Sequence, residues 1–203
     1  MTCSMHNCTI DCMSSSASFE EYCRRLNESD RSAFADLFRL LREELVRYVR
    51  RIVKDDALAH DLIQDVFVSL WNLRTSLDPS RSLKAYIYQM AKNRAIRHLR
   101  DERIHDEKHQ LIKQQSSNRI NKRELPDASV DAGTLKTKLR SWINELPDRQ
   151  KEAILLSRFQ GLSHKEIADI MAISPRTVNN HIIRALGHLQ SRIEAFEPTL
   201  LEV

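Results

Sequence analysis

The chain has 203 residues, which suits one large domain or two small ones. Three glycines and 6% aromatic residues are too few for the turns of an all-β fold, and no apolar run approaches the ~18 residues of a membrane span. Residues 1–18 have neither the basic start nor the apolar stretch of a secretory signal. We therefore expect a cytoplasmic protein with no membrane insertion.

All four cysteines fall within the first 23 residues. In a cytoplasmic chain this pattern does not predict a disulfide framework. Three of them could gather with His6 around zinc, but no Cys-x-x-Cys pair is present. We predict a disordered tail over residues 1–17 and no metal or other cofactor. Whether the true start is Met13 stays open.

Residues 18–103 are predicted to form a bundle of four helices. Ser18 and Glu21 have the spacing of a capping box and indicate a short first helix. A second helix begins near Asp30, and its apolar residues recur every three or four positions, which predicts one buried stripe. That stripe comprises Phe34, Leu37, Phe38, Leu41, Leu45, Val49 and Ile52.

The third and fourth helices follow the same pattern. Asp55 and Asp56 cap the third helix, whose inward residues are Leu62, Ile63, Val66, Phe67, Leu70 and Trp71. A turn at Pro79 separates it from the fourth helix, which runs from about Ser82 past Arg100. Residues 104–133 have few large apolar side chains, and we predict a flexible linker with some helix at its start.

A second helical domain is predicted over residues 134–195, before a short tail over 196–203. Its last two helices begin at a capping box, Ser163 with Glu166, and at Ser174 followed by Pro175. Their spacing is that of a helix-turn-helix, in which Ala172 replaces the usual turn glycine. The sequence therefore predicts an all-α fold of two small helical domains.

Charge is unevenly distributed over the predicted bundle. Residues 55–80 contain five acids against one arginine, whereas residues 84–103 contain six bases against two acids. This asymmetry indicates two partners, one of them a polyanion. On the fourth helix, Asn93 and Arg97 with nearby tyrosines suit unstacked single-stranded bases. A solvated basic face with tyrosines in the core explains the same pattern about equally well.

The last helix gives a stronger signal. Its outward positions are predicted to be Arg176, Thr177, Asn179, Asn180, His181 and Arg184. Asparagine pairs well with adenine and arginine with guanine, and such side chains also bind phosphate oxygens. An ordinary helical hairpin with a solvated polar face is the alternative, but solubilising faces are usually dominated by Glu and Lys. We therefore favour DNA recognition.

Two segments of the chain resemble a known family. The stretch AHDLIQDVFVSLWNLRTSLDPSRSLKAYIYQMAKNRAIRHLR is similar to region 2 of the extracytoplasmic-function sigma factors of bacterial RNA polymerase. The stretch ELPDRQKEAILLSRFQGLSHKEIADIMAISPRTVNNHIIRALGHL is similar to their region 4. The resemblance implies a region 2 bundle and a region 4 helix-turn-helix joined only by a linker. It also implies an alternative sigma factor that directs core polymerase to specific promoters and helps to open them.

The resemblance assigns expected roles to individual residues. The docking surface for core polymerase is expected at Asp61, Leu62, Gln64, Asp65 and Phe67. Contacts to the −10 element are expected from Lys84, Tyr86, Tyr88, Asn93, Arg94, Arg97, His98 and Arg100, with Asn93 at the pocket for a flipped base. The −35 element is expected to meet Arg176, Thr177, Asn179, Asn180, His181 and Arg184. Residues 179–181 depart from the common pattern, so the −35 preference cannot be transferred from a relative.

The implied partners are promoter DNA and core polymerase, through the clamp of its largest subunit and the flap of its second-largest. An anti-sigma factor is a further candidate partner, and the promoter, regulon and inducing signal stay open. The last thirty residues also resemble LuxR-type DNA-binding domains, so a LuxR-type regulator is the alternative. Residues 18–100 lack the strand-like alternation of a receiver domain, which argues against it. No enzyme motif is present, and we expect no catalytic activity.

Overall fold

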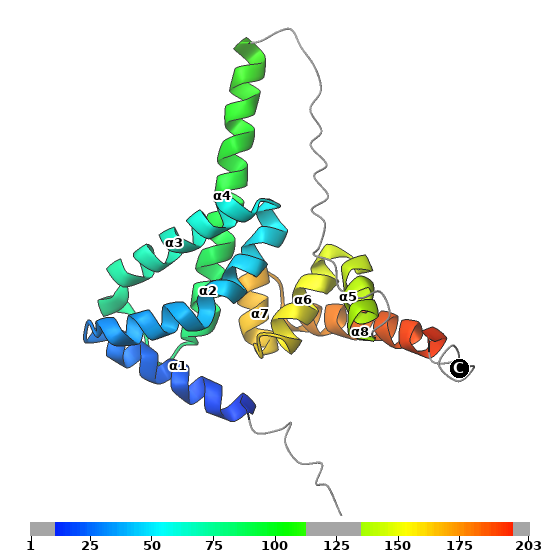
Figure 1. The fold of residues 1–203 in the computed structure, drawn as a ribbon, viewed down its shortest axis with the longest axis horizontal. Helices are drawn as coiled ribbons and strands as arrows, with labels where there is room; N and C mark the ends of the chain where they lie inside the picture. Colours follow the sequence, from blue (N-terminus) through cyan, green and yellow to red (C-terminus); the bar gives the residue numbers. More distant parts are fainter. Residues whose placement is uncertain (1–10, 113–134, 197–203) are drawn as a thin grey trace, which may run out of the picture. The chain divides into compact units, whose positions relative to one another are not determined.

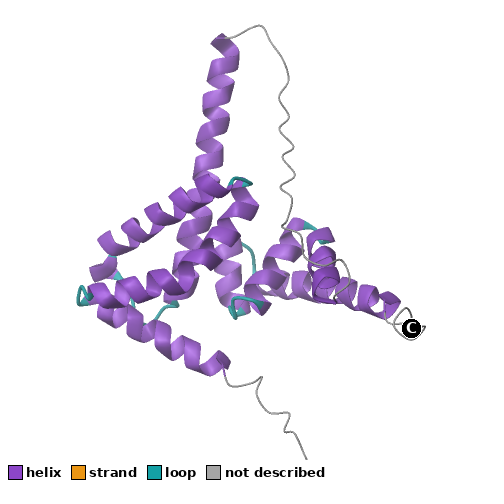
Figure 2. Ribbon diagram, viewed as in Figure 1, coloured by secondary structure: helices purple, strands orange, loops and turns teal. Residues whose placement is uncertain are grey.

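The computed structural model describes residues 11–112 and 135–196, and the side chains of 19–105 and 137–196. All elements in these ranges are helical, and none of them is a strand (Figure 2). The chain divides into two compact units between Leu125 and Pro126. The expectation of an all-α fold in two parts is therefore confirmed.

The first unit is a four-helix bundle (Figure 1). Its elements are α1 (Asp11–Asn27), α2 (Arg31–Val53), α3 (Asp56–Asn72), a short 3-10 helix η1 (Arg74–Ser76) and α4 (Leu83–Ile112). Helices α2, α3 and α4 pack against one another, and α1 packs on α2 and α4. The predicted stripe of α2 supplies core residues such as Leu37, Leu41 and Leu45, each at most 1% exposed. Burial of such side chains is the main term that stabilises the bundle.

Local capping determines where α2 and α3 begin. The carboxylate of Asp30 accepts hydrogen bonds from the backbone N–H groups of Ser32 (2.8 Å) and Ala33 (3.2 Å). The carboxylate of Asp55 accepts one from the N–H of Leu58 at 3.0 Å. Each cap satisfies amide groups that have no partner inside the helix, so both helix starts follow from the sequence.

One predicted boundary differs from the structure. Helix α1 begins at Asp11, so Ser18 lies inside the helix rather than at its cap, and residues 11–17 are not part of a tail. Helix α4 continues past residue 103 to Ile112, which agrees with the helix expected at the start of the linker. The physical reason is that Glu, Arg, Lys and Gln, which dominate residues 102–110, are strong helix formers even without an apolar stripe. The rest of the predicted linker, residues 113–133, lies outside the described residues.

In the second half of α4, none of the described side chains, at residues 96–105, is buried. The last buried side chain among the described residues of the helix is Ala95. Figure 1 shows this half of the helix extending beyond the other helices of the bundle. Arg97, Arg100 and Arg103 of this half are therefore accessible.

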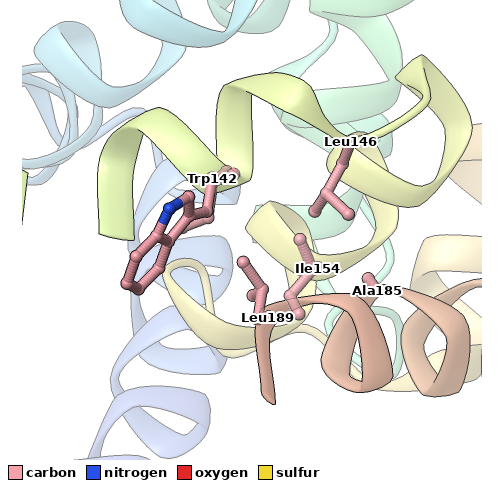
Figure 3. Packing of buried hydrophobic residues seen from close by; sticks show 6 residues of the cluster. Trp142, Leu146, Ile154, Ala185 and Leu189 are labelled. Atoms are coloured by element: carbon pink, nitrogen blue, oxygen red, sulfur yellow. The ribbon is translucent and has the colours of Figure 1, made fainter. Parts of the chain in front are cut away.

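The second unit contains four helices. They are α5 (Leu135–Glu145), α6 (Asp148–Arg158), α7 (His164–Met171) and α8 (Pro175–Phe196). A cluster from α5, α6 and α8 forms one part of its core (Figure 3). In it, Trp142 meets Phe196 edge to face with ring centroids 5.8 Å apart. This cluster fixes α8 along its buried side and leaves the opposite side to solvent.

Candidate protein and nucleic-acid interfaces

Helices α7 and α8 form the predicted helix-turn-helix. The Ser163–Glu166 capping box is present, with Ser163 N–H donating to Glu166 at 2.7 Å and Glu166 N–H donating to Ser163 at 3.3 Å. At the turn, Ala172 has φ 53° and ψ 48°, the left-handed conformation that glycine usually adopts. Ala168, buried beside this turn, accepts the N–H of Ile173 at 3.1 Å.

The polar face of α8 lies opposite its buried face. Val178, Ile182, Ala185 and Leu189 are all buried. Of the predicted −35 residues, Arg176, Asn180 and Arg184 are exposed. Thr177, Asn179 and His181 are half-buried at the edges of this face. A role in binding the DNA major groove therefore fits Arg176, Asn180 and Arg184 best.

The backbone N–H and the hydroxyl group of Thr177 both take part in the cap of α8. Its N–H donates to the Ser174 hydroxyl at 3.1 Å, and the two hydroxyls lie 2.8 Å apart. These bonds fix the start of α8 at Pro175. Thr177 therefore positions the helix in addition to any contact that it makes with a ligand.

The exposed side of α4 carries most of the predicted −10 residues. Asn93, Arg97 and Arg100 are exposed, and Tyr86 is 37% exposed. Their spacing of seven, four and three residues places them along one side of the helix. A cationic, partly aromatic stripe of this kind suits a nucleic-acid strand.

Tyr88 is an exception, because the structure places it in the core. It is 0% exposed, and its ring packs edge to face on Tyr48 of α2 at 5.3 Å. Burial raises the pKa of the Tyr88 phenol. The expectation that Tyr88 meets DNA is wrong, because tertiary packing rather than helix spacing decides which of the two tyrosines is exposed.

Three other predicted −10 residues are engaged within the chain. The ammonium group of Lys84 lies 5.5 Å from the centre of the Phe19 ring, a cation–π contact with α1. Arg94 forms an ion pair with Asp65 of α3, and His98 lies 3.3 Å from Glu102. All three are half-buried, so they shape this surface as much as they present charge.

A pocket of about 150 Å³ lies between α1 and the segment that leads into α4. It is lined by Cys23, Ser76, Leu77, Asp78, Arg81, Ser82, Leu83 and Tyr86. Among the predicted −10 residues only Tyr86 lines it, and Asn93 does not. Sequence reasoning missed the pocket, because its walls come from helices that are distant in the chain.

Helix α1 also anchors the loop that forms part of the pocket lining. The side-chain amide of Asn27 donates to the carbonyl of Leu77 at 3.1 Å. Within the loop, Asp78 accepts the Ser80 N–H at 2.9 Å and the Ser80 hydroxyl at 2.7 Å. The bonds from Ser80 lower the pKa of Asp78. The loop is therefore preorganised by the bundle.

The predicted docking surface on α3 is only partly exposed. Asp61, Gln64 and Asp65 are exposed, but Leu62 is 5% and Phe67 2% exposed. The two apolar residues are correctly placed on α3 but face the core, so they can support the surface without touching a partner. Sequence reasoning missed Val68, which is 60% exposed one turn after Gln64 and Asp65 and adds an apolar side chain to this face.

Most of the N-terminal segment that contains Cys3, His6, Cys8 and Cys12 lies outside the described residues. Cys3, His6 and Cys8 lie outside the described residues, and Cys12 lies in α1. Cys23 is a free thiol, 1% exposed, and burial followed by nearby Asp78 and Glu20 raises its pKa. Over the ranges that the structure describes, no three potential ligands gather as a metal site. Over the same ranges, no helix has both the length and the apolar content to cross a membrane.

A helix-turn-helix with an exposed Asn/Arg face, joined to a bundle with separate acidic and basic faces, defines a DNA-binding transcription protein. Residues 37–104 match the family model of sigma-70 region 2, and residues 136–189 match that of sigma-70 region 4. The chain belongs to the sigma-70 family, in its extracytoplasmic-function subfamily. Because residues 37–104 match region 2 and not a receiver, the LuxR-type alternative is not favoured.

Full-length relatives align along most of the chain. The sigma factor NccH of Alcaligenes xylosoxydans xylosoxydans is 25% identical over 182 residues, 87% of this chain and 95% of that protein. SigM of Bacillus subtilis, an extracytoplasmic-function sigma factor, is 28% identical over 160 residues, 77% of this chain and 92% of that protein.

Two solved structures of similar fold are complexes. CnrH, bound to the cytosolic domain of CnrY, has a TM-score of 0.56 at 19% identity and covers 88% of this chain and 98% of its own. Bartonella quintana RpoE, bound to the anti-sigma factor NepR, has a TM-score of 0.56 at 22% identity. It covers 79% of this chain and 96% of its own. At these identities the comparisons support the fold.

Proposed function

We propose that the chain binds core RNA polymerase in the cytoplasm, directs it to specific promoters and helps to open their −10 region. The observation that carries this proposal is the separation of charge within the first unit. An acidic face on α3 and a basic face on α4 lie on one bundle. Two faces of opposite charge suit a basic protein surface and a polyanion at the same time.

The acidic face is the proposed contact with the clamp of the largest polymerase subunit. Asp61, Gln64 and Asp65 are accessible there, with Val68 exposed beside them. Apolar area at the centre of a polar rim is the usual composition of a protein interface. Leu62 and Phe67 hold α3 in place from the core side.

The basic face of α4 is the proposed contact with the opened −10 strand. Asn93, Arg97 and Arg100 would follow its phosphates and base edges, and Tyr86 offers a ring for stacking. Tyr86 also lines the preorganised pocket beside α1, which is close in size to a nucleobase. We therefore infer that an unstacked base enters at this pocket rather than at Asn93.

The second unit is the proposed reader of the −35 element. Arg176, Asn180 and Arg184 are accessible on α8, and the helix start is held by the Ser174 cap. We propose domain extents of 18–103 and 134–195, the first extended by the ends of α1 and α4. The flap of the second-largest subunit and an anti-sigma factor are further proposed partners. The latter is supported by the complexes of CnrH and RpoE.

Reconstitution tests the proposal. Core polymerase from the source bacterium is combined with the full chain and given fragmented genomic DNA, and the 5′ ends of the RNA are sequenced. Starts that share two sequence elements, and that vanish when the chain is omitted, are expected. Starts that are the same with and without the chain would contradict the proposal. No chemistry is required of the chain itself, because bond formation belongs to the polymerase.

A further inference from the structure

Helix α8 has an apolar side chain within its polar face. Ile183 is 58% exposed, three residues after Asn180 and directly before Arg184. A single exposed isoleucine is ordinary on a protein surface and has no meaning by itself. What distinguishes Ile183 is its position among side chains suited to base edges.

Helix geometry places Ile183 on the outward face. With about 3.6 residues per turn, residues three and seven positions apart share one side of a helix. Ile183 is three residues from Asn180 and seven from Arg176, both exposed. Leu186 and Ile193, the other exposed large hydrophobic residues of α8, point in directions about 120° or more from that of Asn180.

The surroundings leave the Ile183 side chain accessible. Gly187 follows it by one turn, and nothing lies within 4 Å of the position that a Cβ of Gly187 would occupy. No side chain therefore covers Ile183 from that side. Asn180 is exposed on the preceding turn. A partly apolar strip therefore lies beside Asn180 on this face.

One group in the DNA major groove matches such a strip. Each T·A pair exposes the thymine C5-methyl there, the one apolar group among donors and acceptors on the base edges. We propose that Ile183 packs against the C5-methyl of a thymine in the upstream promoter element, as a specificity-determining residue. The proposal rests on the proposed function, in which α8 enters the major groove of that element.

Selection from a duplex library tests the proposal first. The full chain, bound to core polymerase, selects from promoter duplexes randomised across the upstream element. The wild type, Ile183→Ala and the matched control Ile193→Ala are compared. The wild type should select T·A at one position facing α8. Ile183→Ala should lose the preference at that position only, and Ile193→Ala should keep it.

Removal of the methyl group alone then isolates the contact. Deoxyuridine in place of the selected thymine should weaken wild-type binding about four-fold, which is the affinity change expected when the burial of one methyl-sized group is lost. For Ile183→Ala the two duplexes should bind equally. Equal sensitivity to deoxyuridine in both proteins would overturn the proposal. The proposal would also be overturned if Ile183→Ala kept the wild-type base preferences but bound core polymerase differently. That result would assign Ile183 to a protein interface.

The two levels of the argument can fail separately. If the wild-type complex selects no upstream sequence, α8 is not the reader, and the proposed function fails together with the role of Ile183. If the wild type selects a sequence that Ile183→Ala selects equally well, only the role of Ile183 fails.

Discussion

Replacing Asp65 with Arg should abolish association with core polymerase while leaving the fold intact. The structure separates these two effects. Asp65 is 54% exposed on α3, and its only described ion pair is with Arg94, itself 39% exposed. An exposed pair of this kind contributes about 0.2–1 kcal/mol to folding. The free energy of unfolding should therefore change by no more than about 1 kcal/mol.

The effect on docking should be much larger. A like charge placed against a basic partner surface costs several kcal/mol, and each 1.4 kcal/mol is a tenfold change in affinity, so a loss of about 100-fold or more is expected. Affinity is measured by fluorescence anisotropy with labelled chain and core polymerase. Thermal unfolding, followed by circular dichroism, reports on the fold.

Two control variants separate the intramolecular ion pair from the docking contact. Arg94→Ala breaks the pair but keeps Asp65, and should associate nearly as the wild type does. The double variant Asp65→Arg with Arg94→Asp restores an ion pair of opposite sense, and should still fail to associate. If the double variant regained wild-type affinity, the Asp65 effect would be structural and the docking assignment would be refuted.

Three further predictions concern stability. Ala172→Gly should raise Tm, because an L-residue in the left-handed conformation costs about 1–2 kcal/mol. The added freedom of glycine in the unfolded chain offsets only about 0.4–1 kcal/mol of this gain. A lower Tm would contradict the turn geometry. Gly187→Ala should stabilise the second unit by about 0.5–1 kcal/mol, since the new methyl meets nothing within 4 Å; calorimetry showing destabilisation would disprove this. Hydrogen bonds from Ser32, Arg25 and Ala33 hold the pKa of Asp30 well below its usual range, so its contribution to stability is complete above about pH 5 and is lost as the pH falls further. The Tm advantage of the wild type over Asp30→Asn should therefore shrink between about pH 5 and pH 2, and a constant difference would exclude this linkage.

Local signals in the sequence located most of the helices. The caps at Asp30, Asp55, Ser163 and Ser174 act over two or three residues, so the chain itself shows where α2, α3, α7 and α8 begin. Their apolar spacing then determines which side is buried. The start of α1 was harder, because the pair Ser18–Glu21 has the spacing of a cap although the helix begins before it.

The candidate surfaces depend on contacts between distant residues. Tyr86 and Tyr88 are both aromatic residues of α4, and only packing on Tyr48 of α2 distinguishes them. The Asp65–Arg94 pair joins residues 29 positions apart, which no local pattern predicts. A motif likewise names Leu62 and Phe67 without showing which way they face. Exposed apolar residues such as Val68 are visible only once the bundle is built.

The central claim is that α4 acts on opened DNA and α8 on intact duplex. Transcription by core polymerase with the full chain is measured on a closed promoter and on the same promoter with a pre-melted −10 bubble. Asn93→Ala should transcribe poorly from the closed template and recover in part on the bubble, because the cost of opening is already met. The Asn179→Ala/Asn180→Ala variant should be impaired equally on both. Identical behaviour of the two variants on closed and bubble templates would contradict the claim.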